Sequence, residues 1–150
     1  MTSRLVGLCA ALVSCAVGAA CGASAIFDMG GRDEVGLIIF YSDTARLTAP
    51  DTVLHGVSFD VSFSTFAGGC TRKIAHDDVR ISGNAVEVRP YDRNAGGNFC
   101  TADLLFLKRV LPVRVEVPGA YVIRLIGLQR GASTGGTNGA AEITRAIVVR

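Results

Sequence analysis

Apolar and polar residues alternate with a period of two over much of the chain beyond residue 56. In Val57–Ser64, valine and phenylalanine fill the odd positions, and serine and aspartate fill the even ones. Val113–Val117 and Tyr121–Leu125 repeat this alternation. Since successive side chains of a strand point to opposite faces, each segment predicts a strand with one buried and one hydrated face. Val35–Tyr41 is almost continuously apolar and predicts a strand buried on both faces.

One hairpin can be predicted down to its register. Two short apolar-polar segments flank Gly83-Asn84, and a glycine at the first position of a two-residue loop favours a type II′ turn. This loop would pair Ser82 with Ala85, Ile81 with Val86, Arg80 with Glu87, Val79 with Val88 and Asp78 with Arg89. The apolar pairs then share one face and the opposite charges share the other. A slip of one residue would destroy both matches.

Other segments set the limits of the strands. Pro90 and Pro112 cannot donate a hydrogen bond to a sheet, so we expect them on edge strands or at bulges. Leu104–Leu107 fits a strand or a short helical turn that Thr101 would cap. Gln129–Ala140 is rich in glycine, serine and threonine and predicts a loop before a last strand at Glu142–Val149.

The pattern as a whole predicts an all-β protein. About seven to eight short strands separated by glycine, proline and asparagine turns are typical of a single β-sandwich. No helical period, internal repeat or linker to a second domain is visible in the sequence.

The first 27 residues have a different character. No charged residue lies between Arg4 and Asp28, and the run is rich in leucine, valine and alanine. A basic start, an apolar middle and small residues at a cleavage point are typical of an export signal. We therefore predict a signal peptide at residues 1–25, of lipoprotein or general export type, and one domain at residues 26–150.

Three fates of the signal remain open. A general signal peptidase would cut after Ala25, at the end of an A-x-A sequence. Alternatively, Cys15 or Cys21 would be acylated after cleavage at a lipobox, which would hold the domain to a membrane. Third, Leu5–Phe27 is long enough to span a bilayer uncleaved, although its second half is mainly alanine and glycine. All three place the domain outside the cytoplasm, as a periplasmic, membrane-anchored or secreted protein.

The export signal determines how the remaining cysteines are interpreted. Removal of the signal leaves Cys70 and Cys100, and two thiols in an oxidising compartment predict a disulfide. Such a bridge would stabilise the fold by about 3–4 kcal/mol on a chain-entropy argument. The net charge of the whole chain is only +2, and no basic run interleaves with aromatic residues, so we expect no nucleic-acid partner.

Several motifs between Gly56 and Gly127 resemble those of exported bacterial immunoglobulin-like domains of uncharacterised role. They are Val57-Ser58-Phe59-Asp60-Val61, Thr65-Phe66-Ala67-Gly68-Gly69-Cys70, Val88-Arg89-Pro90-Tyr91, Cys100 and Pro118-Gly119-Ala120-Tyr121. The resemblance covers about half of the chain and implies an Ig-like β-sandwich with Tyr121 as a corner tyrosine. It implies an architecture and no particular ligand.

Few residues suggest chemistry. His76-Asp77-Asp78 is the most reactive cluster, and a metal-dependent hydrolase that uses it is one alternative function; a polar turn is the structural interpretation. A small-ligand carrier with an apolar cavity is another. Our main prediction is a non-catalytic envelope module with no cofactor or metal, which binds an unknown protein or glycan. Its candidate binding loop, beside the predicted disulfide, contains Arg72, Lys73, Asp92, Arg93 and Asn94.

Overall fold

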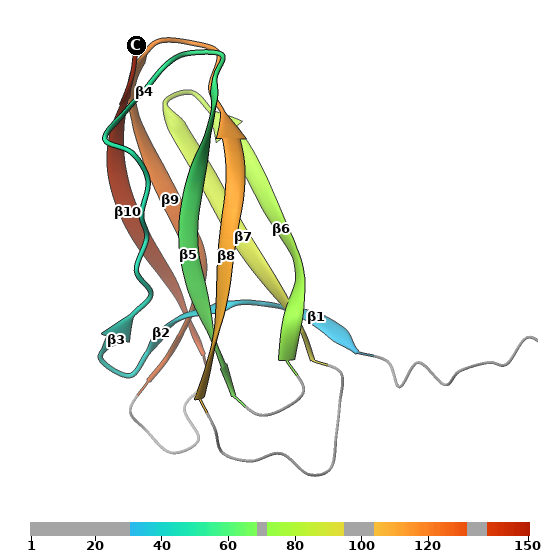
Figure 1. Cartoon of the computed structure of the whole chain (residues 1–150). Coiled ribbons are helices and arrows are strands. Elements are labelled where there is room, and N and C mark those ends of the chain that lie inside the picture. The colour runs from blue at the N-terminus through green and yellow to red at the C-terminus, as the bar shows by residue number, and fades with distance from the viewer. Residues whose placement is uncertain (1–30, 69–71, 95–103, 132–137) are drawn as a thin grey trace, which may run out of the picture.

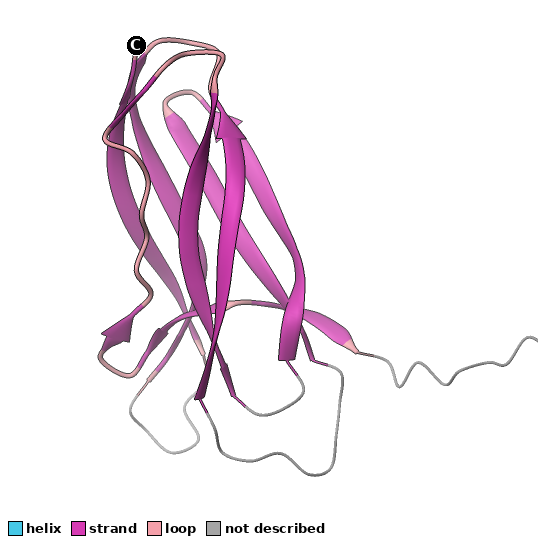
Figure 2. Ribbon diagram, in the orientation of Figure 1, coloured by secondary structure: helices cyan, strands magenta, loops and turns pink. Residues whose placement is uncertain are grey.

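A computed structural model describes residues 31–68, 72–94, 104–131 and 138–150. The all-β prediction is confirmed, because the regular elements of these residues are strands (Figure 2). They are β1 (Arg32–Val35), β2 (Leu37–Phe40), β3 (Asp43–Thr44), β4 (Thr52–Val53), β5 (Ser58–Gly68), β6 (Arg72–Ser82), β7 (Ala85–Asn94), β8 (Leu104–Arg114), β9 (Gly119–Arg130) and β10 (Gly139–Val149). Over the same residues, no helix is long and apolar enough to cross a membrane.

The strands form one mixed sheet that curls on itself (Figure 1). The long antiparallel pairs are β5 with β8, β6 with β7, and β9 with β10. Parallel pairing joins β7 to β9 and β2 to β9, while β2 also contacts β5 through Leu37 and Phe66. The short strand β2 therefore connects the β5–β8 pair to the larger layer made by β6, β7, β9 and β10. The curl brings these two parts of the sheet face to face.

The predicted hairpin is confirmed at every pair. Strands β6 and β7 pair Ser82 with Ala85, Ile81 with Val86, Arg80 with Glu87, Val79 with Val88 and Asp78 with Arg89. Gly83 has a φ of 57°, as the first central residue of a type II′ turn requires. Turn chemistry and side-chain pattern therefore agree on one register.

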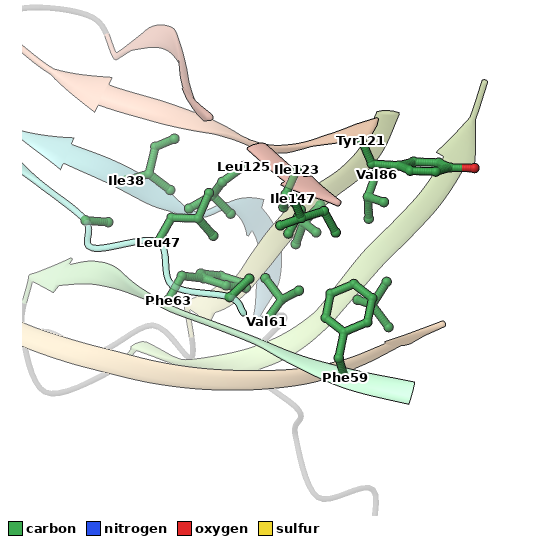
Figure 3. Close-up of a cluster of buried hydrophobic side chains, with 14 of the residues drawn as sticks. Ile38, Leu47, Phe59, Val61, Phe63, Val86, Tyr121, Ile123, Leu125 and Ile147 are labelled. Carbon is green, nitrogen blue, oxygen red and sulfur yellow. The ribbon is translucent and has the colours of Figure 1, made fainter. Parts of the chain in front are cut away.

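The core lies inside the curl, between the facing strands (Figure 3). Its central side chains come from the alternating segments: Phe59, Val61, Phe63, Val86, Val88, Val113, Val115, Tyr121, Ile123 and Leu125 are all buried. Each such large apolar side chain contributes about 1.5–3 kcal/mol by leaving water. Val57 and Val117, which the alternation also placed inside, are exposed; Val57 precedes β5, and Val117 lies in the turn between β8 and β9.

Two segments differ from the expected strand limits. The apolar run Val35–Tyr41 does not form one strand, since Gly36 separates β1 from β2. A Cβ atom at Gly36 would lie 2.7 Å from the Thr65 methyl group, so this close crossing of β5 requires glycine. Leu104–Leu107, which fitted a strand or a helical turn, begins strand β8.

The two prolines have different surroundings. Pro112 lies on β8, at one end of the strand order, as expected for an edge strand. The expectation fails for Pro90, because β7 has neighbours on both sides. On the side of β7 opposite β6, strand β9 pairs with the residues up to Val88, and β1 pairs with those from Tyr91 onward. Pro90 therefore occupies the gap between two partners, where no amide hydrogen is needed.

Several predicted features lie outside the described residues. They are the signal segment with Cys15, Cys21 and the cleavage point after Ala25, and the two cysteines of the predicted disulfide, Cys70 and Cys100.

Candidate functional site

Six strand ends gather at one end of the curled sheet, which we call the loop-bearing end (Figure 1). Strands β5, β7 and β9 finish here, and β6, β8 and β10 start here. The candidate binding loop was predicted in this region, and Arg72 is the first residue of β6. Residues from distant parts of the sequence are thus brought together on a rigid support, a common setting for recognition sites.

A row of four aromatic rings crosses this end of the sheet, and we call it the aromatic row. The ring centroids of Tyr41 and Phe40 lie 4.5 Å apart in an edge-on arrangement. Phe40 stacks on Phe66 at 5.9 Å, and Phe66 contacts Phe106 at 5.3 Å. Such ring pairs contribute about 0.5–1.5 kcal/mol beyond their buried area. The row links β2, β5 and β8, and its two outer rings are exposed.

Tyr41 has an unusual backbone. It follows β2 in a tight turn to β3, with a φ of 55°, and it is the one non-glycine residue with positive φ in the described part of the chain. This conformation costs a bulky residue about 1–3 kcal/mol, and glycine is the usual choice in such a turn. The tyrosine side chain is nevertheless 50% exposed. The turn thus keeps a half-exposed tyrosine at a position where glycine would remove the strain.

Beside the aromatic row lies a cavity of about 150 Å³, which we call the loop-end pocket. Its apolar lining comes from Val35, Leu37, Phe40, Phe66 and Leu128. Polar and charged groups complete the lining: Glu34, Arg72, Arg130 and Asn138.

The two arginines of the pocket have different partners. Arg72 donates to the Glu34 carboxylate at 2.9 Å, so this pair is neutral overall. The Arg130 guanidinium lies 5.8 Å from the centre of the Phe40 ring, and within the described ranges no carboxylate pairs with it. The pocket therefore combines apolar side chains with a substantial polar lining, and its Arg130 has no carboxylate partner among the described residues.

A buried ionic cluster lies inside the curl and connects its two edges. Arg109 of β8 donates to the carboxylates of Asp77 on β6 and Asp92 on β7. The same guanidinium donates to the carbonyl oxygens of His76 and Tyr91, at 3.2 and 3.1 Å. The Arg109 side chain is only 1% exposed. Its ion pairs join strands that do not pair through their backbones.

Burial dominates the electrostatics of this cluster. One guanidinium faces two carboxylates, so the cluster holds an excess negative charge when both are ionised. Burial raises the pKa of Asp92, and the Arg109 charge and a hydrogen bond from the Thr65 hydroxyl at 3.2 Å oppose this rise only in part. Asp92 Oδ2 and Arg109 Nε are buried without a hydrogen-bond partner in the part of the chain that the structure covers.

The structure separates the residues of the candidate binding loop. Arg72 lines the loop-end pocket, and Lys73 is exposed on β6. Asp92, Arg93 and Asn94 form the last residues of β7. Asp92 points into the interior, whereas Arg93 donates to the Asp33 carboxylate at 2.8 and 3.2 Å and lowers the pKa of Asp33. Arg72 is therefore the predicted residue that reaches the pocket.

The side chains of the His76-Asp77-Asp78 cluster point in different directions. The His76 ring stacks on Tyr91 at 4.5 Å, and its Nδ1 lies 3.6 Å from Asp33 Oδ2. Asp77 contacts Arg109 in the interior, and Asp78 lines a charged depression on the opposite face with Arg89. No group of three histidine, cysteine or acidic residues in the described ranges is placed to hold a metal ion. The three neighbours therefore do not converge on one reaction centre here.

Sequence reasoning did not identify the aromatic row or Arg109. A usable signal existed for Arg109, because Leu107, Arg109, Leu111 and Val113 occupy the inward positions of β8. A charged residue in that register must find a buried partner. The aromatic row had no comparable signal, since its rings come from three strands whose neighbours are set by the curl.

Comparison with known protein families, with characterised proteins and with solved structures finds no match to this chain.

Proposed function

We propose that this protein is an exported, non-catalytic binding module that holds its ligand in the loop-end pocket. The observation that carries the proposal is the position of Arg130 against Phe40 of the aromatic row, where both residues line the pocket. Ligand sites are usually concave and bring apolar side chains together with convergent polar groups, and both kinds line this pocket.

The pocket also indicates which chemical features the ligand has. A cavity of about 150 Å³ accommodates a group the size of a benzene ring. Arg130 carries a positive charge with no carboxylate partner in the described region, so it favours a negative charge next to that group. The ligand is therefore a protein side chain or sugar derivative that presents a ring-sized apolar group and an anion together.

We further propose that the curled sheet is a variant of the Ig-like sandwich and that it acts outside the cytoplasm. Two facing layers with a filled apolar core, and a buried Tyr121 at the start of β9, support the first point. The uncharged apolar segment after Arg4 supports the second. Mass spectrometry of the mature N-terminus tests export: cleavage after Ala25 or acylation at Cys15 or Cys21 agrees with it, and an intact Met1 in the cytoplasmic fraction does not.

Binding is tested with a small anionic aromatic probe. Phenylacetate, its neutral isostere phenylacetamide and the sugar acid glucuronate are titrated into isotopically labelled protein, purified after expression of the full chain. We expect phenylacetate to shift the amide resonances of Leu128 and Arg130, and phenylacetamide to bind more weakly because it lacks the charge. Glucuronate shows whether a sugar ring replaces the aromatic ring.

Arg130→Gln should weaken phenylacetate binding roughly fivefold, the effect of about 1 kcal/mol from a solvent-accessible charge pair. Arg114→Gln is the matched control, because Arg114 lies at the far end of β8 in an exposed pair with Glu116. Equal binding of the charged and neutral probes, or equal effects of the two variants, would contradict the proposal.

A further inference from the structure

Strand β6 has one unpaired edge. It pairs with β7 along its length, and no second strand of the described chain pairs with it. The Val122 amide donates to the Asn84 carbonyl at 3.0 Å, which fixes the direction of alternate backbone groups in β7. The backbone N–H and C=O groups of Val86 and Val88 therefore point toward β9. The backbone groups of Glu87 and Arg89 point the other way and pair with those of Arg80 and Asp78 on β6. The backbone groups of Asp77, Val79 and Ile81 therefore point outward from the hairpin.

The end of this edge is also apolar on its inner face. Val79 is 40% exposed and Ile81 is 48% exposed, although their cross-strand partners Val88 and Val86 are completely buried. The apolar side chains on the inner face are therefore covered by other residues on β7 but exposed to solvent on β6. An unpaired strand with exposed apolar side chains is a template for pairing with another strand.

The charges on the outer face select the partner. Asp78 and Arg80 flank Val79, and neither forms an ion pair with another residue of the described structure. Two copies of β6, paired antiparallel with Val79 opposite Val79, bring Asp78 of each copy opposite Arg80 of the other. Centring the pair on Asp78 or on Arg80 would instead place like charges opposite each other.

This register also continues a row of charges that each copy already contains. Arg124 donates to Glu142 at 2.7 Å and to Glu87 at 2.8 Å, and Glu87 lies opposite Arg80. The row ends at Arg80, which would face the second copy's Asp78, itself opposite Arg89. Charges would therefore alternate in sign across the join between the two molecules.

We propose that two copies of this chain form a two-fold symmetric dimer by antiparallel β6–β6 pairing centred on Val79. Both edges contribute the same residues, as a closed two-fold interface requires. The dimer covers the exposed Val79 and joins the two β6–β7 hairpins into one continuous layer.

Charge reversal gives the first test. Sedimentation equilibrium over a concentration series measures self-association of the protein purified from the full chain. Asp78→Arg alone and Arg80→Asp alone each place like charges across the join, so each should weaken the dimer by roughly tenfold or more. An equal mixture of the two variants should associate again, because the opposite charges then face each other. Circular dichroism confirms that each variant is folded.

A cross-link gives a second test that leaves the charges unchanged. Across a hydrogen-bonded antiparallel pair the Cα atoms lie about 5.5 Å apart, which suits a disulfide. Val79→Cys should therefore form a covalent dimer on mild oxidation, whereas Ile81→Cys, displaced from the two-fold axis, should not. A protein that stays monomeric at all concentrations, single reversals that associate like the wild type, or equal cross-linking of the two cysteine variants would overturn the proposal.

Discussion

Replacing Arg109 with leucine should cost about 3–5 kcal/mol of unfolding free energy at neutral pH. The guanidinium is almost fully buried and is the shared partner of the Asp77 and Asp92 carboxylates. Removing the cation leaves buried negative charge without compensation, and this accounts for a loss of that size. Two smaller effects oppose each other: the His76 and Tyr91 carbonyls lose a donor, and leucine buries additional apolar surface. A domain of this size has about 5–15 kcal/mol in total, so the variant should be close to unfolding.

Urea denaturation followed by circular dichroism measures this loss, with Arg114→Leu as the control on the same strand. Arg114 and Glu116 form an exposed pair, so the control should lose no more than about 1 kcal/mol. The loss for Arg109→Leu should shrink at acid pH, because protonation removes the buried negative charge. Replacing Asp77 and Asp92 with asparagine in the same variant should restore part of the stability. A loss below about 1 kcal/mol, or one that is the same at acid and neutral pH, would refute the interpretation of the cluster.

Two further predictions concern single positions. Burial raises the pKa of Asp92, so its contribution to stability is complete below the ordinary carboxyl pKa and is lost as the pH rises through the folded-state pKa. Asp92→Asn should remove this loss, because asparagine carries no charge at any of these pH values. Measured by urea titration, the stability of the variant relative to the wild type should rise from acid to neutral pH. Parallel pH profiles of the two proteins would contradict the expectation. Gly127→Ala should destabilise the protein by about 1–3 kcal/mol, because the new Cβ would lie 2.7 Å from the Gly36 carbonyl oxygen and 2.7 Å from an Ile38 methyl group. The melting temperature measures this, and an unchanged value would show that β2 can move away from β9.

Local pattern was sufficient to predict those parts of the fold that depend on neighbours in sequence. The register of the β6–β7 hairpin followed from Gly83 and the side-chain alternation. The inward positions of β5 and β9 followed from the alternation alone. The parallel contact of β2 with β9 could not be predicted in this way, because its two strands are distant in sequence and share no turn.

The candidate site was predicted less completely, for the same reason. Arg72 was expected at a binding surface and lines the loop-end pocket. Asp92 was expected in a loop and is buried, because the alternation of β7 continues to the end of the strand. Phe40, Phe66 and Phe106 become a row only when three strands meet, and no single segment contains that information.

The position of β2 has a consequence for how the chain reaches its native state. β1 and β2 are the first described strands to be synthesised, but their partners β7 and β9 come much later in the sequence. Contacts between distant segments form slowly, since the intervening chain must be closed into a loop before they are gained. The pairing of β2 with β9 therefore forms only after most of the polypeptide exists, whereas its contacts with β3 and β5 can form earlier. Such a delay would suit the export that we propose, because an exported chain crosses the membrane before it folds.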